Sequence, residues 1–140
     1  MSRVFWDTNL FIYLFEDYGQ LSKRASGLRE RMILRGDQLL TSTLTLAEIL
    51  VKPVEKGDEE LARAYQEALS AAAVLLAFDR EAAGQYARIR KDRTIRAPDA
   101  IQLACAAQAR VDLFITNDSR LAGKVIPGIQ FLVALENAFL

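Results

Sequence analysis

Four acidic side chains, spread along the whole chain, are the residues best suited to catalysis. The sequence has no histidine and a single cysteine, Cys105. Histidine acid–base catalysis, serine–histidine and cysteine–histidine hydrolysis and histidine-ligated zinc are therefore excluded. If the protein is a hydrolase, carboxylates must do the chemistry, alone or with a hard divalent metal ion. The candidates are Asp7, Glu48, Asp99 and Asp118.

Each of these acids, taken alone, also has a purely structural interpretation. Asp7 and Asp118 follow predicted strands and suit helix N-caps. Glu48 lies three residues after Thr45, which is the spacing of a capping box, and its apolar neighbours predict a side chain held partly near the core. Asp99 falls in the first turn of a predicted helix, where the helix dipole favours a negative charge.

The elements that would position these acids follow an α/β pattern, because short strand-like runs alternate with longer helical runs. We expect one domain over residues 1–140, and a helix that stops before Pro53, since proline disfavours helix in the residue before it. The predicted strands are Arg3–Asp7, Gln38–Thr41, Ala73–Phe78, Leu113–Thr116 and an edge strand at Gln130–Leu132. The predicted helices are Leu10–Phe15, Leu21–Arg35, Thr45–Val51, Asp58–Ala72, Asp79–Arg90, Pro98–Arg110, Asp118–Gly123 and Ala134–Phe139.

The predicted elements bring the four acids to one end of the sheet. Asp7 and Asp118 follow strand carboxyl ends, and Glu48 and Asp99 lie in first helical turns. In an open parallel sheet such positions face one crevice, where ligands usually bind. Carboxylates gathered there repel one another, and a divalent cation relieves that repulsion. Because all the ligands are oxygens, Mg²⁺ or Mn²⁺ suits the site better than zinc.

A basic segment precedes the third acid of the set. The formal net charge is zero, so a polyanion would have to bind a local patch. One interpretation is a solvated helix end followed by a loop, since helix C-termini favour cations. The other is a surface that contacts the phosphates of a polyanion beside the metal site. The cations are Arg88, Arg90, Lys91, Arg93 and Arg96, and we expect phosphate contacts from Lys91, Arg93 and Arg96.

Other features bear on location and assembly. Cys105 lies among apolar residues, which predicts a buried thiol. Residues 1–5 show no secretory signal, and no apolar run approaches the roughly 20 residues of a membrane span. We therefore expect a cytoplasmic protein with no membrane partner. The run Leu10–Phe15 is apolar nearly all round, which predicts burial in its own core or, alternatively, a homodimer surface.

Four segments together resemble the signature segments of PIN-domain ribonucleases, and the VapC-type toxins of toxin–antitoxin pairs are similar in size. The segments are Asp7-Thr8-Asn9, Thr43-Leu44-Thr45-Leu46-Ala47-Glu48, Pro98-Asp99-Ala100-Ile101-Gln102-Leu103-Ala104 and Phe114-Ile115-Thr116-Asn117-Asp118. The resemblance implies a PIN-like three-layer α/β/α sandwich with a central, mainly parallel sheet of four to five strands. It also implies an endoribonuclease that cleaves RNA to a 5′-phosphate and a 3′-hydroxyl, a cognate antitoxin and a homodimer. The phosphates contacted by Lys91, Arg93 and Arg96 would then be those of RNA.

The resemblance assigns roles residue by residue. Asp7, Glu48, Asp99 and Asp118 would be the catalytic acids that hold one or two Mg²⁺ or Mn²⁺ ions, and Asn9 and Thr116 would support them through hydrogen bonds. The sequence departs from the family pattern in two respects. Ser119 and Arg120 follow Asp118 where some members carry a further acid, which puts the second metal position in doubt, and Leu121 replaces an aromatic residue.

Three alternatives follow from the same residues. A receiver domain would need an acidic pair after the first strand, and a haloacid-dehalogenase-like phosphatase would need an aspartate in place of Asn9. Both requirements fail in this sequence. A catalytically silent PIN-like module that binds RNA or protein satisfies every motif and stays open as the alternative.

Overall fold

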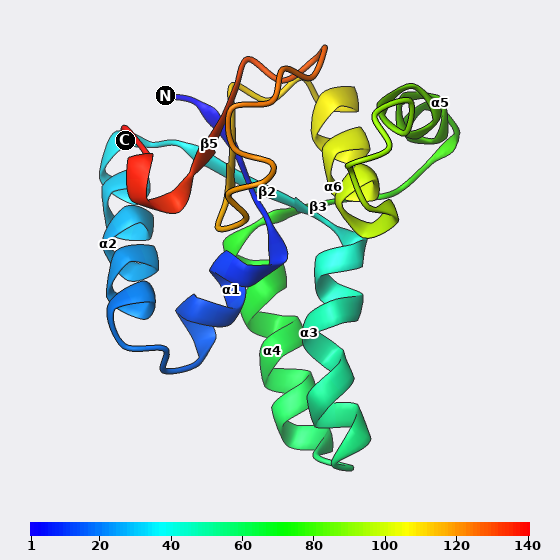
Figure 1. Cartoon of the computed structure of the whole chain (residues 1–140). Coiled ribbons are helices and arrows are strands. Elements are labelled where there is room, and N and C mark those ends of the chain that lie inside the picture. The colour runs from blue at the N-terminus through cyan, green and yellow to red at the C-terminus, as the bar shows by residue number, and fades with distance from the viewer.

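Five short strands form one parallel sheet at the centre of the molecule (Figure 1). The computed structural model describes all 140 residues of the chain. The spatial order of the strands is β3-β2-β1-β4-β5, and every neighbouring pair is parallel. β1 is therefore central, and its carboxyl end lies beside that of β4. The strands are β1 (Arg3–Trp6), β2 (Gln38–Ser42), β3 (Val74–Leu76), β4 (Leu113–Thr116) and β5 (Phe131–Ala134).

Helices cover both faces of the sheet and complete three layers. The alternation of side chains along β1 sends Phe5 to one face, with α5 and α6, and sends Val4 and Trp6 to the other, with α1 to α4. Phe5 stacks on Phe114 of β4 with ring centroids 4.9 Å apart. The predicted α/β fold with a parallel central sheet is confirmed. The helices are α1 (Thr8–Phe15), α2 (Gln20–Arg35), α3 (Thr43–Glu55), α4 (Glu59–Ala72), α5 (Arg80–Ile89) and α6 (Ala97–Gln108).

The apolar helix α1 packs into the core of its own chain. Leu10 and Phe11 are fully buried, and Phe11 contacts Trp6 of β1 with ring centroids 5.2 Å apart. Residues 12–15 of the helix are partly buried against the same cluster. Burial in its own core is therefore confirmed as the role of this segment. Cys105 of α6 is buried as predicted, and burial raises the pKa of its thiol to about 11.

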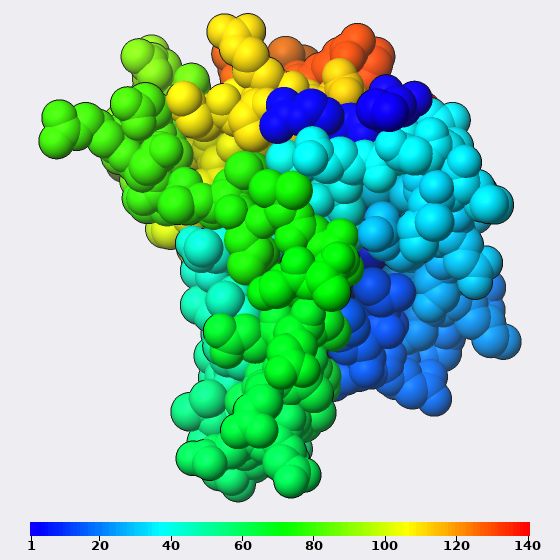
Figure 2. All heavy atoms as spheres, turned by 180° about the vertical axis from the view of Figure 1, so that it is seen from behind, coloured from blue at the N-terminus to red at the C-terminus, as the bar shows by residue number.

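The prediction that a helix ends before Pro53 is wrong. α3 begins at Thr43 and continues through Pro53 to Glu55. A proline in the last turn removes one intrahelical hydrogen bond, and Pro53 is buried in a helix that forms a hairpin with α4. Figure 2 shows this hairpin, in cyan and green, projecting from the body of the molecule.

Two predicted helices near the C-terminus are also absent. The segment 118–123 is a set of turns, because the Asp118 carboxylate accepts a hydrogen bond from the Arg120 N–H and the Gly123 N–H donates to Leu132 of β5. The segment 134–139 starts inside the sheet, because Ala134 pairs with Thr116 of β4. Only a single 3₁₀ turn follows, at Leu135–Asn137.

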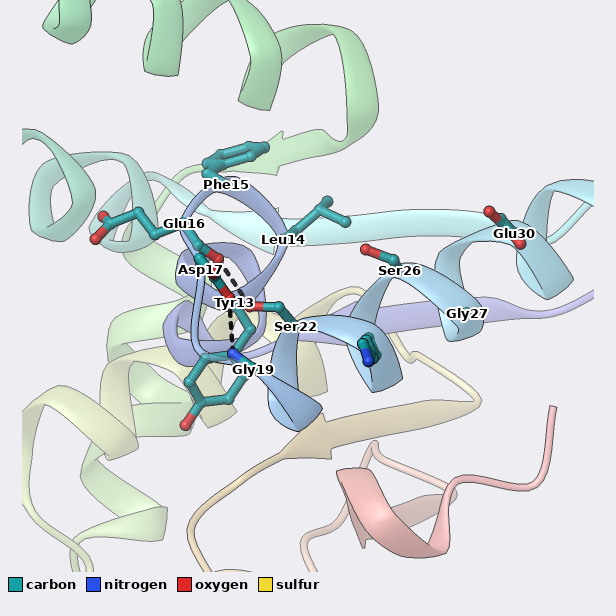
Figure 3. Close-up of a pocket in the computed structure, with 11 residues that line it drawn as sticks. Tyr13, Leu14, Phe15, Glu16, Asp17, Gly19, Ser22, Ser26, Gly27 and Glu30 are labelled. Atoms are coloured by element: carbon teal, nitrogen blue, oxygen red, sulfur yellow. Dashed lines mark hydrogen bonds between the residues drawn. The ribbon is translucent and has the colours of Figure 1, made fainter.

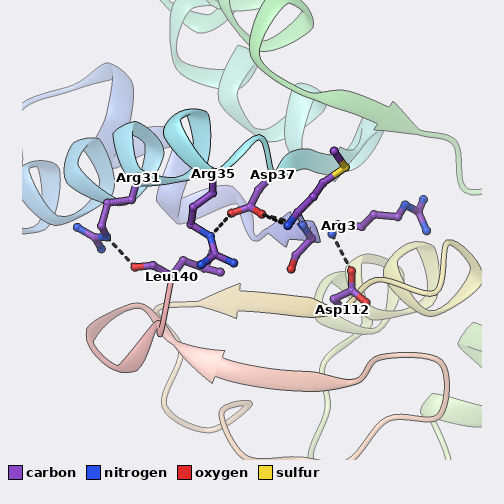
Figure 4. Close-up of polar contacts among 8 residues, drawn as sticks. Arg3, Arg31, Arg35, Asp37, Asp112 and Leu140 are labelled. Carbon is purple, nitrogen blue, oxygen red and sulfur yellow. Dashed lines mark hydrogen bonds and ion pairs between the residues drawn. The ribbon is translucent and has the colours of Figure 1, made fainter.

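Polar contacts hold the N-terminal end beside the sheet and the C-terminal residue against α2 (Figure 4). The buried Asp37 carboxylate accepts from the Ser2 N–H at 2.7 Å and pairs with Arg35 at 2.9 Å. The Asp112 carboxylate accepts from the Arg3 N–H at 2.8 Å. At the other end, the Arg31 side chain donates to the backbone oxygen of Leu140 at 2.8 Å.

Among the helices, none has both the length and the apolar character that a membrane span requires.

Replacement of Gly128 by alanine should destabilise the fold. Gly128 has a φ of 98°, and a Cβ added there would lie 2.7 Å from the carbonyl oxygen of Ala107 in α6. We expect the Gly128→Ala variant to lose about 1–3 kcal/mol in the free energy of unfolding, measured by urea denaturation. Gly84→Ala is the matched control, because Gly84 lies in α5 with no backbone contact, and alanine should stabilise that helix slightly. Equal stabilities of the two variants would contradict the close approach of this loop to α6.

Candidate metal centre

The four predicted acids line one cavity at the carboxyl edge of the sheet. The cavity has a volume of about 300 Å³ and includes Thr8, Asn9 and Gln102 in its wall. Asp7 follows β1, Asp118 follows β4, and these two strands are paired neighbours. Asp99 reaches the cavity from the first turn of α6 and Glu48 from the second turn of α3. Segments up to 111 positions apart in the sequence therefore meet at one place, as the spacing of the motifs predicts.

Asp7 is the most buried of the four acids. It is the N-cap of α1, where its Oδ1 atom accepts from the Thr8 N–H at 2.9 Å, and only 9% of the residue is exposed. Its Oδ2 atom accepts from the Thr116 hydroxyl at 2.9 Å. The pKa of Asp7 is raised from 3.8 to about 6, mainly by burial. The nearby charges of Asp99 and Glu48 add to the rise, and the two hydrogen bonds oppose it. The cap interpretation is thus correct. The same carboxylate lies in the cavity wall, where burial disfavours its negative charge.

Thr116 connects the acids that follow β1 and β4. Its hydroxyl donates to Asp7 and accepts from the Asp118 N–H at 3.0 Å, and the residue is fully buried. Asn9 lines the cavity with an exposed side chain and forms no hydrogen bond with any of the acids. Of the two expected supporting residues, only Thr116 contacts the acids in this conformation.

Glu48 is positioned differently from the sequence-based expectation. The capping-box interpretation is wrong, because Ser42 is the N-cap of α3 and accepts from the Leu44 N–H at 3.2 Å. Glu48 is also exposed, so its apolar neighbours do not hold it near the core. Its carboxylate instead accepts a hydrogen bond from the Thr8 hydroxyl at 2.6 Å. One short contact with α1 therefore directs Glu48 toward the cavity.

A buried polar network beneath the cavity escaped the sequence analysis. Gln102 is only 2% exposed, and its amide donates to the hydroxyls of Thr8 at 3.0 Å and Thr45 at 2.8 Å. Its carbonyl accepts from the hydroxyl of Ser42. The available signal was a single amide in the apolar run of α6, three residues after Asp99 and hence on the same helical face. Gln102 thereby connects α6 to α1, whose N-cap is Asp7, and to α3, which carries Glu48.

Opposing charges act on Asp99 and Asp118. Burial and the charge of Asp118 raise the pKa of Asp99, while Arg120 and Arg96 counteract that effect. For Asp118 the balance is reversed, because hydrogen bonds from the Arg120 side chain lower its pKa. Arg96, the N-cap residue of α6, is the only member of the basic segment that acts on these acids. No residue of the basic segment, Arg96 included, is in the cavity wall, and Lys91 lines a separate cavity.

The donor set fits a hard divalent cation by its chemistry. All candidate ligand atoms are carboxylate oxygens, which suit Mg²⁺ and Mn²⁺. A cation would also relieve the unfavourable burial of the Asp7 charge beside Asp99 and Glu48. In the present conformation no three Cys, Asp or Glu side chains are close enough together to bind a single ion. The acids thus share a cavity wall, and side-chain rotation would be needed to bring them onto one ion.

A larger cavity, with a volume of about 520 Å³, lies between α1 and α2 (Figure 3). Its wall includes Tyr13, Glu16 and Asp17, and the Asp17 carboxylate accepts from the Gly19 N–H at 2.9 Å. None of the four predicted acids reaches it. The acidic cavity is therefore distinguished by its residues and not by its size.

Comparison with known proteins assigns the family. The sequence pattern of the PIN domain family matches residues 4–125. This chain therefore belongs to the PIN domain family, whose fold the resemblance of the four segments predicted. A search of curated protein sequences finds no match.

Solved structures of similar fold come from toxin–antitoxin systems. The structure of VapBC2 from Rickettsia felis bound to a promoter DNA fragment matches with a TM-score of 0.74 and 15% identity, over 94% of this chain and 97% of that chain. DNA-bound VapBC from Salmonella typhimurium matches with a TM-score of 0.69 and 23% identity, over 96% and 99%. A toxin–antitoxin complex from Klebsiella pneumoniae has 28% identity and a TM-score of 0.62, over 91% and 95%. These likenesses extend over nearly the whole length of each chain.

Proposed function

We propose that this protein is a metal-dependent endoribonuclease, the toxin of a VapBC-type toxin–antitoxin pair. One observation carries the proposal: four acids from four separate segments line a single cavity at the carboxyl edge of a PIN-family sheet. The similar structures named VapBC and toxin–antitoxin complex support the toxin role. Asp7, Glu48, Asp99 and Asp118 would hold one or two Mg²⁺ or Mn²⁺ ions.

The proposed reaction is hydrolysis of an RNA phosphodiester bond. Bound divalent ions would supply a water of lowered pKa and would stabilise the charge on the leaving oxygen. Asp7 is held in place by Thr116 and the Thr8 N–H, and Glu48 by the Thr8 hydroxyl. Because the chain has no histidine, proton transfer in the site would depend on carboxylates and water.

The proposed activity is tested with purified protein and mixed single-stranded and structured RNAs. We expect cleavage in Mn²⁺ or Mg²⁺, no cleavage in EDTA, and recovery when the metal is restored. The products should carry 5′-phosphate and 3′-hydroxyl ends, which end-specific enzymes distinguish. Cleavage that persists in EDTA, or metal-supplemented protein that cuts none of the RNAs, would contradict the proposal.

The basic segment should contribute to RNA affinity through phosphate contacts. Arg93 and Arg96 are exposed, and Arg96 precedes the helix that carries Asp99. We expect the Arg93→Ala/Arg96→Ala variant to bind RNA more weakly and to lower the slope of log affinity against log salt by about 1.4, since each phosphate contact on a single strand contributes about 0.7. Fluorescence anisotropy at several salt concentrations measures both quantities. The charge-matched control is Arg24→Ala/Arg63→Ala, which changes two other exposed arginines. Equal losses of RNA affinity in the two double variants would contradict an RNA-binding surface at Arg93 and Arg96.

The proposed protein partner is a cognate antitoxin, and the proposed assembly is a homodimer. In this proposal a segment of the antitoxin covers the acidic cavity and blocks access of RNA. A reading frame for a small partner protein directly beside the gene, and a stable complex on co-expression, would support this role. Purified complex should cleave RNA more slowly than the free protein at equal concentration.

The alternative function is a catalytically silent PIN-like module that binds RNA or protein. Two observations favour it. The acids share a cavity, but no three of them are close enough together to bind one ion. In addition, the Arg120 side chain donates hydrogen bonds to both carboxylate oxygens of Asp118. Such a module would bind RNA and leave it intact in every metal. The cleavage assay therefore separates the two functions directly.

A further inference from the structure

The Asp118 carboxylate is fully engaged by a single arginine two residues later. The Nε atom of Arg120 donates to Oδ1 at 3.0 Å, and its Nη2 atom donates to Oδ2 at 2.6 Å. The backbone N–H of Arg120 donates to Oδ1 as well, at 2.9 Å. Both oxygens of this acid thus accept hydrogen bonds from Arg120. This two-point arrangement is the strongest form of arginine–carboxylate contact.

The pair lies where a divalent cation and the guanidinium group would compete. Asp118 lines the acidic cavity, and its side chain is 20% exposed, whereas that of Arg120 is 53% exposed. The positive charge of Arg120 also acts on Asp99, the neighbouring acid of the same cavity. A guanidinium and a divalent ion on one carboxylate would repel each other, so both cannot bind it fully at once.

We propose that Arg120 is an exchangeable internal counter-ion of Asp118, which a divalent cation must displace to bind the cavity through this acid. The inference rests on the proposed metal site. Arg120 is at the surface, in a segment of turns, so its side chain can move into solvent without disturbing the core. The exchange would hold the metal affinity below the value that four unpaired carboxylates would give. Arg120 would thus be a positioning residue, because its contact with Asp118 determines whether that carboxylate is free to bind the metal ion.

Calorimetric titration of Mn²⁺ into the full chain at low salt tests this exchange. We expect Arg120→Gln to bind Mn²⁺ about fivefold more tightly than the unaltered protein, the upper range for loss of an exposed ion pair. Arg63→Gln removes the same charge from an exposed position on α4, and it should leave the affinity unchanged. At high KCl concentration the advantage of Arg120→Gln should shrink, because salt screens an exposed pair.

The outcomes separate this inference from the proposed function. Asp7→Asn is included to show that the titrated ion binds the acidic cavity, since it removes a different acid of the set. If Asp7→Asn abolishes binding and Arg120→Gln matches Arg63→Gln, the counter-ion role is refuted and the metal site stands. If the unaltered protein binds no Mn²⁺, or Asp7→Asn binds it equally well, the proposed function itself fails. Thermal melting of each variant confirms that the surface substitutions leave the fold intact.

Discussion

The Asp7→Asn variant should fold and lose metal-dependent RNA cleavage by at least about 100-fold. Asparagine keeps the size of the side chain and a carbonyl oxygen that can accept from the Thr8 N–H. It removes the negative charge that lies deepest in the cavity wall. Cleavage rates at saturating Mn²⁺, measured on the RNA that the unaltered protein cuts, give the loss directly. Glu55→Gln, an exposed change at the end of α3, is the matched control and should cleave normally.

The same substitution should change the pH dependence of stability. The pKa of Asp7 is raised from 3.8 to about 6 in the folded chain, so the folded state holds the proton more tightly than the unfolded state. The stability due to this proton is fully present below pH 4 and is lost as pH rises to about 6 and above. In EDTA, urea denaturation should show a fall on the order of 2–3 kcal/mol across this window. Asp7→Asn should lack that fall, and an identical pH profile in both proteins would contradict the burial of a charged Asp7.

The Gln102→Leu variant should lose both stability and activity. Leucine is similar in size but cannot replace the hydrogen bonds to Ser42, Thr8 and Thr45, whose hydroxyls are buried. Buried polar groups left without partners are costly, so we expect a loss of about 2–4 kcal/mol in the free energy of unfolding. Because the Thr8 hydroxyl also positions Glu48, the cleavage rate should fall about tenfold under conditions where the variant is folded.

A second glutamine on the same helix provides the control for that experiment. Gln108 lies at the C-terminal end of α6 and is exposed, so Gln108→Leu makes the same chemical change without touching the network. Urea denaturation and Mn²⁺-dependent cleavage should both stay near the unaltered values in this variant. If Gln102→Leu were equally harmless, the buried network would have no part in holding the cavity together.

The sequence predicted β1 and β4 well because these two inner strands are short runs of mostly apolar, buried side chains. β1 and β4 lie where the patterns placed them, and Asp7 and Asp118 follow their carboxyl ends. From two neighbouring strand ends and two helix starts, a shared cavity could be inferred without coordinates. The structure shows that the four acids lie around one cavity, and their roles in binding and catalysis stay a prediction.

The errors arose where tertiary contacts decide the local structure. The turns after Asp118 replace a predicted helix because Gly123 donates to β5, a partner that lies nine positions further on. Pro53 predicted the end of a helix, yet α3 continues through Pro53 to Glu55 and packs against α4. Gln102 looked like an ordinary helical residue, since its three hydroxyl partners come from segments up to 94 positions away. Local patterns contain no signal for such distant partners.

The central claim is that the four acids together hold a divalent cation, and a crystal grown with Mn²⁺ tests it most directly. Diffraction data collected at the manganese absorption edge locate the ion independently of any assay. We predict an anomalous peak inside the cavity lined by Asp7, Glu48, Asp99 and Asp118, absent from crystals of Asp7→Asn. A peak at another place, or an empty cavity at millimolar Mn²⁺, would contradict the account.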